Sequence, residues 1–313
     1  MEMSKEIKNI DLVILGGGPA GLTAAIYASR SKMNMLLLEN AILGGQVRNS
    51  YTIENYPGFK KIDGSTLADI MNEQALELGA NIDEFDPIIN VKLSEEEKII
   101  ETGSYIYNAK TVIIATGATP KKLPISNEEK YAGKGIHYCA VCDGAMYEGK
   151  NIAVVGGGNS ALEESIFLTR FAKKVYIIRR HDYFNGEKSL LHEVEDNSKI
   201  EILYNTDLVN VDGDNFVNKA IIKDTKTNEE RELEVSAIFG YIGTEPKTSE
   251  FKDVLNLNEY GYIITDENMR TNISGVYAAG DVREKEYRQI TTAVADGTIA
   301  ALEAEKFVVG KAI

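Results

Sequence analysis

The sequence contains 313 residues, enough for about two domains at the usual length of about 100–200 residues per domain. Hydrophobic residues make up 43% and charged residues 26%, which excludes a mainly disordered or fibrous chain. The formal net charge of −14 argues against a nucleic acid or an anionic membrane as partner, because each requires a basic face. Two cysteines cannot form a disulfide-stabilised secreted scaffold. No signal peptide and no long apolar stretch is recognisable, so the sequence predicts a cytoplasmic protein without a membrane span.

Two segments of equal length, 11–39 and 151–179, carry the same pattern. Each contains a short apolar strand, three glycines, an amphipathic helix and a second apolar strand, which is the βαβ pattern of a dinucleotide-binding unit. The remaining predicted elements, in chain order, are a helix at 64–79, strands at 86–93, 98–107, 215–223 and 231–239, and a closing helix from about 289. The first of these helices is expected to bury one face, formed by Leu67, Ile70, Met71 and Leu76.

Two segments rich in Gly, Pro and Thr, 115–124 and 240–248, are typical of chain crossings between domains. If both are crossings, the second dinucleotide-binding domain is inserted into the first. The predicted fold class is therefore α/β, with two Rossmann-like domains of the three-layer ββα type. The predicted boundaries are 1–116 and 249–313 for the first domain and 117–248 for the inserted domain.

The first glycine motif follows a predicted strand and opens a predicted helix. In such a turn the successive glycines allow a tight bend, close approach of the backbone to a pyrophosphate, and close packing of helix on strand. Glu39 ends the next strand. A carboxylate there can accept hydrogen bonds from ribose hydroxyls but would repel a 2′-phosphate, so this site favours FAD or NAD. The motif consists of Gly16, Gly18 and Gly21.

A second motif of this kind opens the second repeat and consists of Gly156, Gly158 and Ala161. The position that corresponds to Glu39 holds Arg179, which is followed by Arg180 and His181. Guanidinium groups suit a 2′-phosphate, so the second site is predicted to prefer NADPH over NADH. The alternative is that these cations only form a solvated strand end.

The third motif is Cys139-Ala-Val-Cys142, followed by Asp143. A redox-active dithiol is favoured over half of a zinc site, because the sequence supplies no second CxxC and no histidine pair to complete a metal site. Asp143 is a candidate acid–base in thiol–disulfide exchange, although a turn acid before glycine is an equally good interpretation. Asp281, beside Gly280, could accept hydrogen bonds from a ribitol chain, but a turn aspartate is the simpler interpretation.

Taken together, these segments resemble the low-molecular-weight thioredoxin reductases. The match runs through nearly the whole chain, in the order GGGPAGLTAAIYASR, GGQ, ENYPGF, ATGATP, HYCAVCDG, GGGNSALEE, YIGTEPKT, GVYAAGDV and YRQITTAVADGTIAA. The resemblance implies that Cys142 is the thiol nearest the flavin, that Cys139 attacks the disulfide of thioredoxin, and that Asp143 manages protons. It implies no metal ion.

The resemblance also assigns the cofactor sites. FAD would lie in the first domain against Gly16, Gly18, Pro19, Ala20, Gly21, Glu39, Gly45, Gln46, Asn55, Thr116, Gly117, Gly280, Asp281, Arg288 and Gln289. The nicotinamide dinucleotide would lie in the inserted domain against Gly156, Gly158, Asn159, Ser160, Ala161, Arg179 and Arg180.

The sequence departs from this family after the second βαβ unit. The usual motif is HRRxxxR, whereas residues 179–185 read RRHDYFN, so that His181 and Asn185 stand where the family has arginines and only Arg180 remains. A histidine is mostly neutral at pH 7 and replaces an arginine incompletely. NADPH is still expected as the donor, with NADH as the alternative.

The activity implied is that of a homodimeric thioredoxin-disulfide reductase, which passes electrons from NAD(P)H through FAD and a Cys139–Cys142 disulfide to thioredoxin. A rotation of the inserted domain at the crossings would let nicotinamide and the CxxC motif alternate at one flavin face. Two alternatives stay open: a reductase that takes electrons from ferredoxin, and a flavin-binding redox sensor or electron carrier without turnover. The intact GGGNSALEE motif argues against ferredoxin, because only a dinucleotide needs it.

Overall fold

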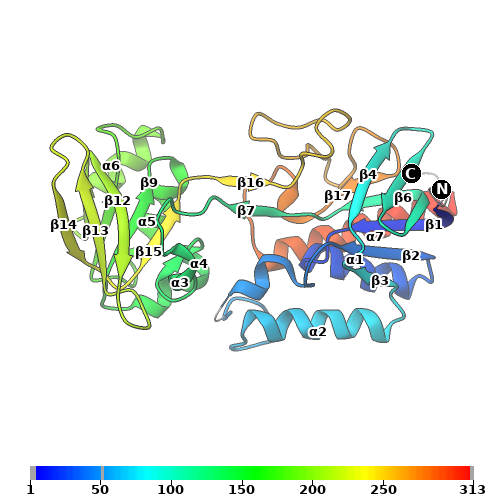
Figure 1. Cartoon of the computed structure of the whole chain (residues 1–313), viewed down its shortest axis with the longest axis horizontal. Coiled ribbons are helices and arrows are strands. Elements are labelled where there is room, and N and C mark those ends of the chain that lie inside the picture. The colour runs from blue at the N-terminus through cyan, green and yellow to red at the C-terminus, as the bar shows by residue number, and fades with distance from the viewer. Residues whose placement is uncertain (1–4, 51–52, 311–313) are drawn as a thin grey trace. The chain divides into compact units, whose positions relative to one another are not determined.

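The computed structural model describes residues 5–50 and 53–310 and divides the chain into two compact units (Figure 1). Unit 1 combines the N-terminal part up to Thr119 with the C-terminal part from Glu245, and unit 2 is the inserted part Pro120–Thr244. Both units contain a parallel sheet with helices, so the predicted α/β fold class is confirmed. The exact domain boundaries predicted from the sequence, and the cofactor assigned to each domain, stay predictions.

The sheet of unit 1 has the strand order β3-β2-β1-β6-β5-β4, with β17 paired to β6. The strands β1, β2, β3, β6 and β17 run parallel, and β4 and β5 form an antiparallel hairpin with β6. The long strand β6 pairs with β1 along one edge, whereas on its other edge its first half pairs with β5 and its second half with β17. The bounds are β1 Glu6–Leu15, β2 Met35–Glu39, β3 Ile82–Glu84, β4 Ile88–Leu93, β5 Lys98–Thr102, β6 Tyr105–Ile114 and β17 Val276–Ala278.

Strand β1 shows why this sheet has a core on each face. Leu12 and Ile14 join one hydrophobic cluster, whereas Val13 and Leu15 join another, as the two-residue period of a strand requires. The first cluster lies under the helices α1 and α7, which pack on each other. The helical elements of unit 1 are α1 Pro19–Arg30, η1 Gly45–Asn49, α2 Gly64–Glu77, η3 Gly280–Val282 and α7 Ile290–Val309.

Helix α2 confirms the predicted helix but corrects its predicted buried face. Leu67 and Met71 are buried, whereas Ile70 is 37% and Leu76 50% exposed. The contact is made instead by small side chains, including Ala75, because α2 packs closely on α1 and η1. Its N-terminus is capped by the Asp63 side chain, which accepts a hydrogen bond from the Thr66 backbone N–H at 2.9 Å.

Unit 2 contains a five-stranded parallel sheet of order β11-β10-β9-β15-β8 and an antiparallel sheet of order β12-β13-β14. Its strands are β8 Ile136–His137, β9 Asn151–Gly156, β10 Lys174–Ile178, β11 Ile200–Leu203, β12 Thr206–Asp212, β13 Lys219–Asp224, β14 Glu230–Glu234 and β15 Ile238–Tyr241. Its helical elements are α3 Glu128–Tyr131, α4 Ala140–Asp143, η2 Gly144–Tyr147, α5 Asn159–Leu168 and α6 Lys188–Asp196.

Two strands expected as single elements are each divided in the structure. The segment 98–107 reverses between β5 and β6, where the Asp86 carboxylate accepts a hydrogen bond from the Ser104 backbone N–H at 3.1 Å. The segment 231–239 ends one sheet in β14 and enters the other in β15. Apolar periodicity cannot reveal such changes of partner, because both halves alternate correctly.

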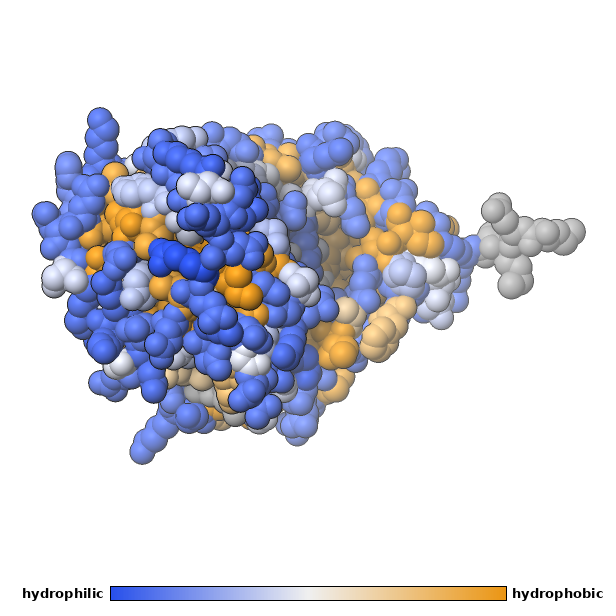
Figure 2. All heavy atoms as spheres, turned by 60° about the vertical axis from the view of Figure 1, so that its left-hand side comes forward, coloured by the Kyte–Doolittle hydropathy of each residue, from blue (hydrophilic) through white to orange (hydrophobic). Residues whose placement is uncertain are grey.

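The two chain crossings between the units, β7 (Ala118–Pro120) and β16 (Thr244–Pro246), pair with each other as a two-stranded sheet. Among the described residues, no helix has the length and apolar character needed to cross a membrane. The face of the molecule shown in Figure 2 carries mostly hydrophilic side chains, between which hydrophobic side chains are also exposed.

Candidate active site: two glycine loops and a disulfide

The first glycine loop connects β1 to α1, and its glycines have different physical roles. Gly16 has φ +106°, and a Cβ there would clash with the Ala115 backbone. A Cβ on Gly21 would overlap the carbonyl oxygen of Gly16. Gly18 is different, because the nearest atom to its hypothetical Cβ is the Gly45 Cα at 4.0 Å. The first and third glycines therefore allow tight packing, whereas the second leaves open space at the start of α1, where a pyrophosphate would fit.

Glu39 ends β2 beside this loop. Its Oε2 accepts a hydrogen bond from the Gly17 backbone N–H at 2.8 Å, and its Oε1 accepts one from Ala41 at 3.1 Å. An ionised carboxylate has about four lone-pair sites, so each oxygen can accept a further hydrogen bond from a ribose hydroxyl. The structure thus holds the Glu39 carboxylate where the first glycine loop ends.

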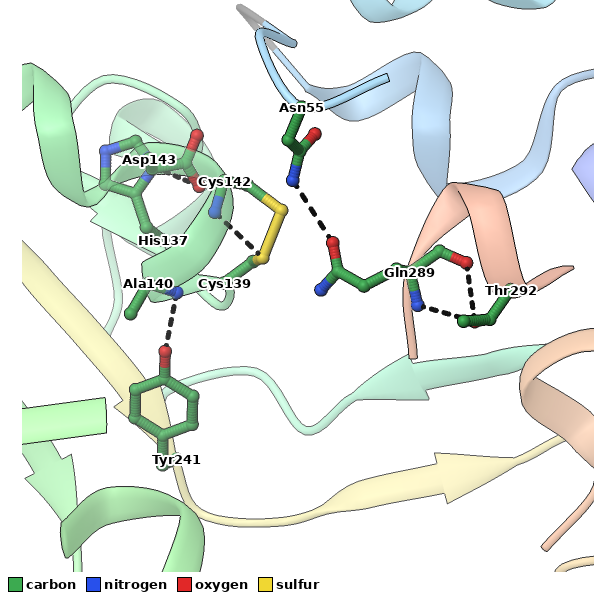
Figure 3. The surroundings of a disulfide bond; sticks show 9 residues. All are labelled: Asn55, His137, Cys139, Ala140, Cys142, Asp143, Tyr241, Gln289 and Thr292. Carbon is green, nitrogen blue, oxygen red and sulfur yellow. Dashed lines mark hydrogen bonds and ion pairs between the residues drawn. A yellow bond between two sulfur atoms is a disulfide. The ribbon is translucent and has the colours of Figure 1, made fainter. Parts of the chain in front are cut away.

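Other predicted FAD residues of unit 1 lie on the neighbouring loops. Gly45 and Gln46 open η1, and Gly45 packs against Gly18. The Asn55 side chain donates a hydrogen bond from Nδ2 to Gln289 Oε1 at 3.2 Å (Figure 3). Gln289 is also the N-cap of α7.

Five further predicted residues lie at the edges of this region. The Thr116 hydroxyl donates to the Lys247 carbonyl at 2.8 Å, and the Gly117 carbonyl accepts from the Lys247 N–H at 3.0 Å, so both join the crossing strands. Pro19 is the first residue of α1, and Ala20 is buried against Gly297 of α7. The Arg288 guanidinium lies 4.2 Å from the centre of the Tyr262 ring, and its buried Nε has no hydrogen-bond partner.

Asp281 in η3 offers a buried carboxylate oxygen that could accept a hydrogen bond from a ligand. Its Oδ1 is buried and has no hydrogen-bond partner. Burial raises the pKa of Asp281, although the positive charges of Lys285 and Arg288 oppose this effect. A buried acceptor without a donor costs free energy, so a hydroxyl-bearing ligand would stabilise this site.

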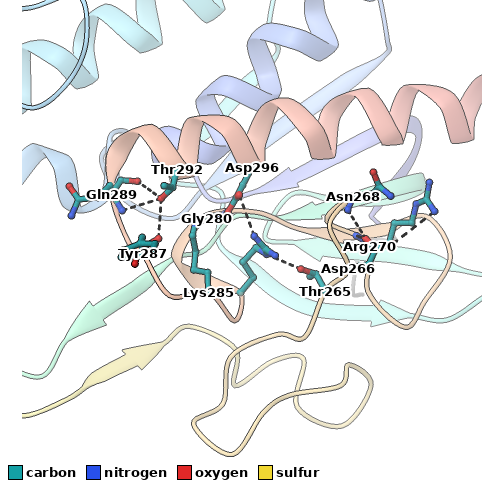
Figure 4. Close-up of polar contacts among 11 residues, drawn as sticks. Thr265, Asp266, Asn268, Arg270, Gly280, Lys285, Tyr287, Gln289, Thr292 and Asp296 are labelled. Carbon is teal, nitrogen blue, oxygen red and sulfur yellow. Dashed lines mark hydrogen bonds and ion pairs between the residues drawn. The ribbon is translucent and has the colours of Figure 1, made fainter. Parts of the chain in front are cut away.

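A second carboxylate supports the loop that carries Asp281. Asp296 of α7 is buried, accepts a hydrogen bond from the Gly280 backbone N–H at 3.0 Å, and pairs with Lys285 at 2.7 Å (Figure 4). It also pairs with Arg283 at 3.3 Å. The negative charge of Asp296 is therefore compensated by ion pairs, whereas the Oδ1 of Asp281 has no hydrogen-bond partner. With the open space at Gly18 and the carboxylate of Glu39, unit 1 fits a dinucleotide that has a polyol chain, as FAD does.

The second glycine loop connects β9 to α5 in unit 2. A Cβ on Gly156 would clash with the Tyr241 carbonyl, whereas nothing lies within 4 Å of a Cβ on Gly158. Ala161 is buried at the position of the third glycine, and Ser160 is exposed. The Asn159 side chain accepts a hydrogen bond from the Glu187 backbone N–H at 2.8 Å. This loop therefore has the same division of roles as the first.

The two arginines after β10 are engaged differently. Arg180 forms two hydrogen bonds with Asp207 Oδ2, at 3.0 and 2.7 Å, so its charge is compensated within unit 2. Arg179 donates from Nε to the Tyr183 carbonyl at 2.7 Å and lies over Gly157, but its buried Nη2 has no partner. Only Arg179 thus presents an unsatisfied guanidinium donor at the glycine loop.

The two cysteines are bonded to each other at the start of α4 (Figure 3). Cys139 is the N-cap of this short helix, and its Sγ accepts a hydrogen bond from the Cys142 backbone N–H at 3.2 Å. Both cysteines are half-buried, and the neighbouring Val141 and Met146 are 45% and 41% exposed. A half-exposed disulfide between residues three apart is accessible to another protein's thiols.

Sequence reasoning missed the residues behind the disulfide. The buried His137 contacts Asp143 through Nδ1 and Tyr147 through Nε2. The Tyr241 hydroxyl accepts a hydrogen bond from the Ala140 N–H at 2.8 Å, and burial raises the pKa of Tyr241 well above its usual value. The position of His137, two residues before Cys139, was a usable signal. Tyr241 gave none, because only the sheet brings β15 to this site.

Comparisons with known proteins agree with this arrangement. A family model described as pyridine nucleotide-disulphide oxidoreductase matches residues 10–297. A relative from Clostridium pasteurianum, described as a 34.2 kDa protein in the rubredoxin operon, is 54% identical over 98% of this chain and its own full length. Thioredoxin reductase of Bacillus subtilis is 43% identical over 98% of this chain and 96% of its own. The crystal structure of thioredoxin reductase from Streptococcus pyogenes matches with a TM-score of 0.92 and 39% identity, over 98% of this chain and 100% of its own.

Proposed function

Because the chain belongs to the pyridine nucleotide-disulphide oxidoreductases, and among them to the thioredoxin reductases, we propose that it reduces the disulfide of a thioredoxin with electrons from NAD(P)H. One observation carries this proposal: the half-exposed Cys139–Cys142 disulfide is in the same unit as a dinucleotide-type glycine loop. The dithiol form of this pair would be the reductant, with Cys139 attacking the partner's disulfide and Cys142 facing the electron source. A homodimer, a cytoplasmic location and a rotation of unit 2 during turnover also belong to the proposal.

FAD would be held by unit 1. The open backbone at Gly18 would receive the pyrophosphate, Glu39 the adenosine ribose and Asp281 the ribitol hydroxyls. Two observations support this assignment. The Oδ1 of Asp281 has no hydrogen-bond partner and could accept one from a ribitol hydroxyl, and the open space at Gly18 could hold the pyrophosphate. When bound, FAD would supply two-electron chemistry between a nicotinamide and a disulfide. The chain's own contribution would be to bind and orient the cofactor.

The nicotinamide dinucleotide would be held by unit 2 at Gly158, Asn159, Ser160 and Arg179. We place NADPH before NADH, because Arg179 has an uncommitted Nη2 where an NAD-specific site would carry an acid. The preference should be modest, since Asp207 compensates the charge of Arg180 and Asn185 is uncharged.

Steady-state reduction of thioredoxin by the FAD-loaded protein tests this proposal. NADPH should support turnover, NADH should do so less efficiently, and Cys139→Ser should abolish turnover while FAD stays bound. Turnover with reduced ferredoxin but with neither nucleotide would replace the proposal by the ferredoxin-dependent alternative. Reduction of the bound FAD by either nucleotide, without reduction of any thioredoxin, would favour the redox sensor.

A further inference from the structure

His137 connects the redox disulfide to a buried hydroxyl. It ends β8, two residues before Cys139, and is 4% exposed. Its Nδ1 lies 3.1 Å from Asp143 Oδ2, and its Nε2 lies 2.7 Å from the Tyr147 hydroxyl oxygen. Its ring stacks on Phe239 of β15, with ring centres 5.3 Å apart. The imidazole is thus fixed on both edges and on one face, and Asp143 directly follows Cys142 (Figure 3).

The chemistry of Tyr147 and Asp143 sets the direction of these hydrogen bonds. Burial, with the nearby charge of Asp143, raises the pKa of Tyr147 well above its usual value, so this phenol keeps its proton. The Asp143 carboxylate can only accept, so the Nδ1–H of His137 donates to it, and in this tautomer Nε2 accepts the hydrogen bond from the Tyr147 O–H. All three groups are satisfied while the disulfide is closed.

We propose that His137 is a positioning residue for thiol–disulfide exchange at Cys139–Cys142: it orients the Asp143 carboxylate, and the Asp143–His137 pair holds one proton while the dithiol is open. The inference rests on the proposed redox cycle of this cysteine pair.

The proton balance of the second exchange step is closed. While the Asp143–His137 pair holds the proton of Cys142, the Cys142 thiolate attacks Cys139 Sγ of the mixed disulfide. The Cys139–Cys142 bond forms, the bond from Cys139 to the partner's sulfur breaks, and the partner's sulfur leaves as a thiolate. That thiolate takes the proton from the pair. The chain's dithiol is oxidised and the partner's disulfide is reduced, so no further reagent is needed.

The other titratable groups around His137 do not compete for this proton near neutral pH. Tyr147 belongs to η2, and Tyr241 projects from β15 with its hydroxyl bonded to the Ala140 N–H. The pKa of each phenol is raised by burial, so both stay protonated. Behind Tyr241, burial and Glu163 raise the pKa of Glu164 in α5. The pair of Asp143 and His137 remains, and its carboxylate directly follows Cys142 in the chain.

A titration of the histidine signals by NMR tests the inference in the unmodified protein. The chain has only three histidines, so His181 and His192, both exposed, serve as internal controls. We expect the midpoint of His137 to rise by about one pH unit when the disulfide is opened with dithiothreitol, because a thiolate nearby favours the imidazolium ion. Equal midpoints in the two forms, or no titration of His137, would overturn the proposal.

Alkylation of the reduced protein with iodoacetamide gives a second test, using His137→Asn and His137→Phe. The first variant keeps a donor for Asp143, and the second keeps the ring on Phe239, but neither can accept a proton. Both should raise the pH of half-maximal alkylation by about one unit, because Asp143 then stands uncompensated beside the thiols. His192→Asn should change nothing. Wild-type behaviour of His137→Asn would refute proton holding. Neither test uses a nucleotide or thioredoxin, so failure of the proposed function would be seen separately.

Discussion

At the scale of single residues, three of the nine buried polar side-chain atoms that lack a hydrogen-bond partner among the described residues lie in the candidate cofactor sites. The Oδ1 of Asp281, the Nε of Arg288 and the Nη2 of Arg179 are all buried and unsatisfied, in a chain whose other charged side chains often form ion pairs. Such atoms destabilise the fold unless a ligand meets them. We therefore expect substitutions at these positions to change ligand affinity and the stability of the ligand-free protein in opposite directions.

Asp281→Asn should show this opposition. Burial raises the pKa of Asp281 in the folded protein. The free energy of unfolding therefore falls as pH rises from about 4, the ordinary aspartate pKa, through the folded-state pKa, because the carboxyl ionises more readily in the unfolded chain. In urea unfolding without FAD, the free energy of unfolding of the variant should fall less over this pH range than that of the wild type. Its FAD affinity should fall about 10-fold, through the loss of a charged hydrogen bond. The exposed Asp253→Asn is the control, and a parallel change of both quantities at Asp281 would contradict the account.

Asp207→Asn should increase the preference for NADPH. The substitution removes the carboxylate that compensates Arg180, so a second guanidinium becomes available to a 2′-phosphate. We expect kcat/KM for NADPH to rise about 3–10-fold, the size of one surface charge–phosphate contact, while the value for NADH stays within about two-fold. Arg179→Ala should act in the opposite direction. Equal changes of kcat/KM for NADPH and NADH would exclude a role of these residues in recognising the 2′-phosphate.

At the scale of secondary-structure elements, close packing depends on glycines that meet backbone. Helices α1 and α7 approach each other so closely that a Cβ on Gly297 would overlap the Ala20 carbonyl oxygen. Both helices also border the glycine loop and the Asp281 loop. The same contact therefore sets the stability of unit 1 and the position of its candidate FAD residues.

Gly297→Ala should therefore destabilise unit 1, although alanine is the better helix former. The extra methyl must push α7 away from α1, which costs about 1–3 kcal/mol in a well-packed core. Urea unfolding of the wild type and the variant measures this cost, with Thr298→Ala on the same helix as control. A gain in stability for Gly297→Ala would mean that the two helices can separate freely.

The surface beside α4 should be used by the protein substrate. Val141, between the two cysteines, and Met146, four residues after Cys142, expose hydrophobic side chains. Met146→Asp should raise KM for thioredoxin about 10-fold, as expected for a central hydrophobic contact, and leave reduction of a small aromatic disulfide unchanged. Phe216→Asp, at another exposed hydrophobic residue of unit 2, is the control. Equal losses with both disulfides would indicate damage to the redox site.

The elements that could be predicted from sequence are those whose signal is local. The βαβ repeats were found because strand, glycines and helix follow each other within thirty residues, and the CxxC motif because its spacing is characteristic. The reversal between β5 and β6 and the exposure of Ile70 depend on which strand or helix packs nearby, so periodicity missed them. The contact of Ala140 with Tyr241 arises because the fold of unit 2 brings β15 to α4, and the contact of His137 with Tyr147 arises because the chain turns back between β8 and η2. No pattern in the sequence contains either contact.

At the scale of the whole molecule, the chain divides its chemistry between two units joined by the paired strands β7 and β16. Unit 1 holds the buried Asp281 oxygen without a hydrogen-bond partner, which suits FAD, and unit 2 holds the disulfide and the second glycine loop. Two redox groups of two electrons each, FAD and the disulfide, would make the loaded protein a four-electron acceptor.

The measurement that tests this account most directly is an anaerobic titration of the FAD-loaded protein with NADPH, followed by a thiol count. The wild type should consume two equivalents of NADPH per chain and gain two thiols, whereas the double variant Cys139→Ser, Cys142→Ser should consume one equivalent and gain none. Consumption of one equivalent by the wild type, with no new thiols, would show that electrons do not reach Cys139–Cys142 and would contradict the account.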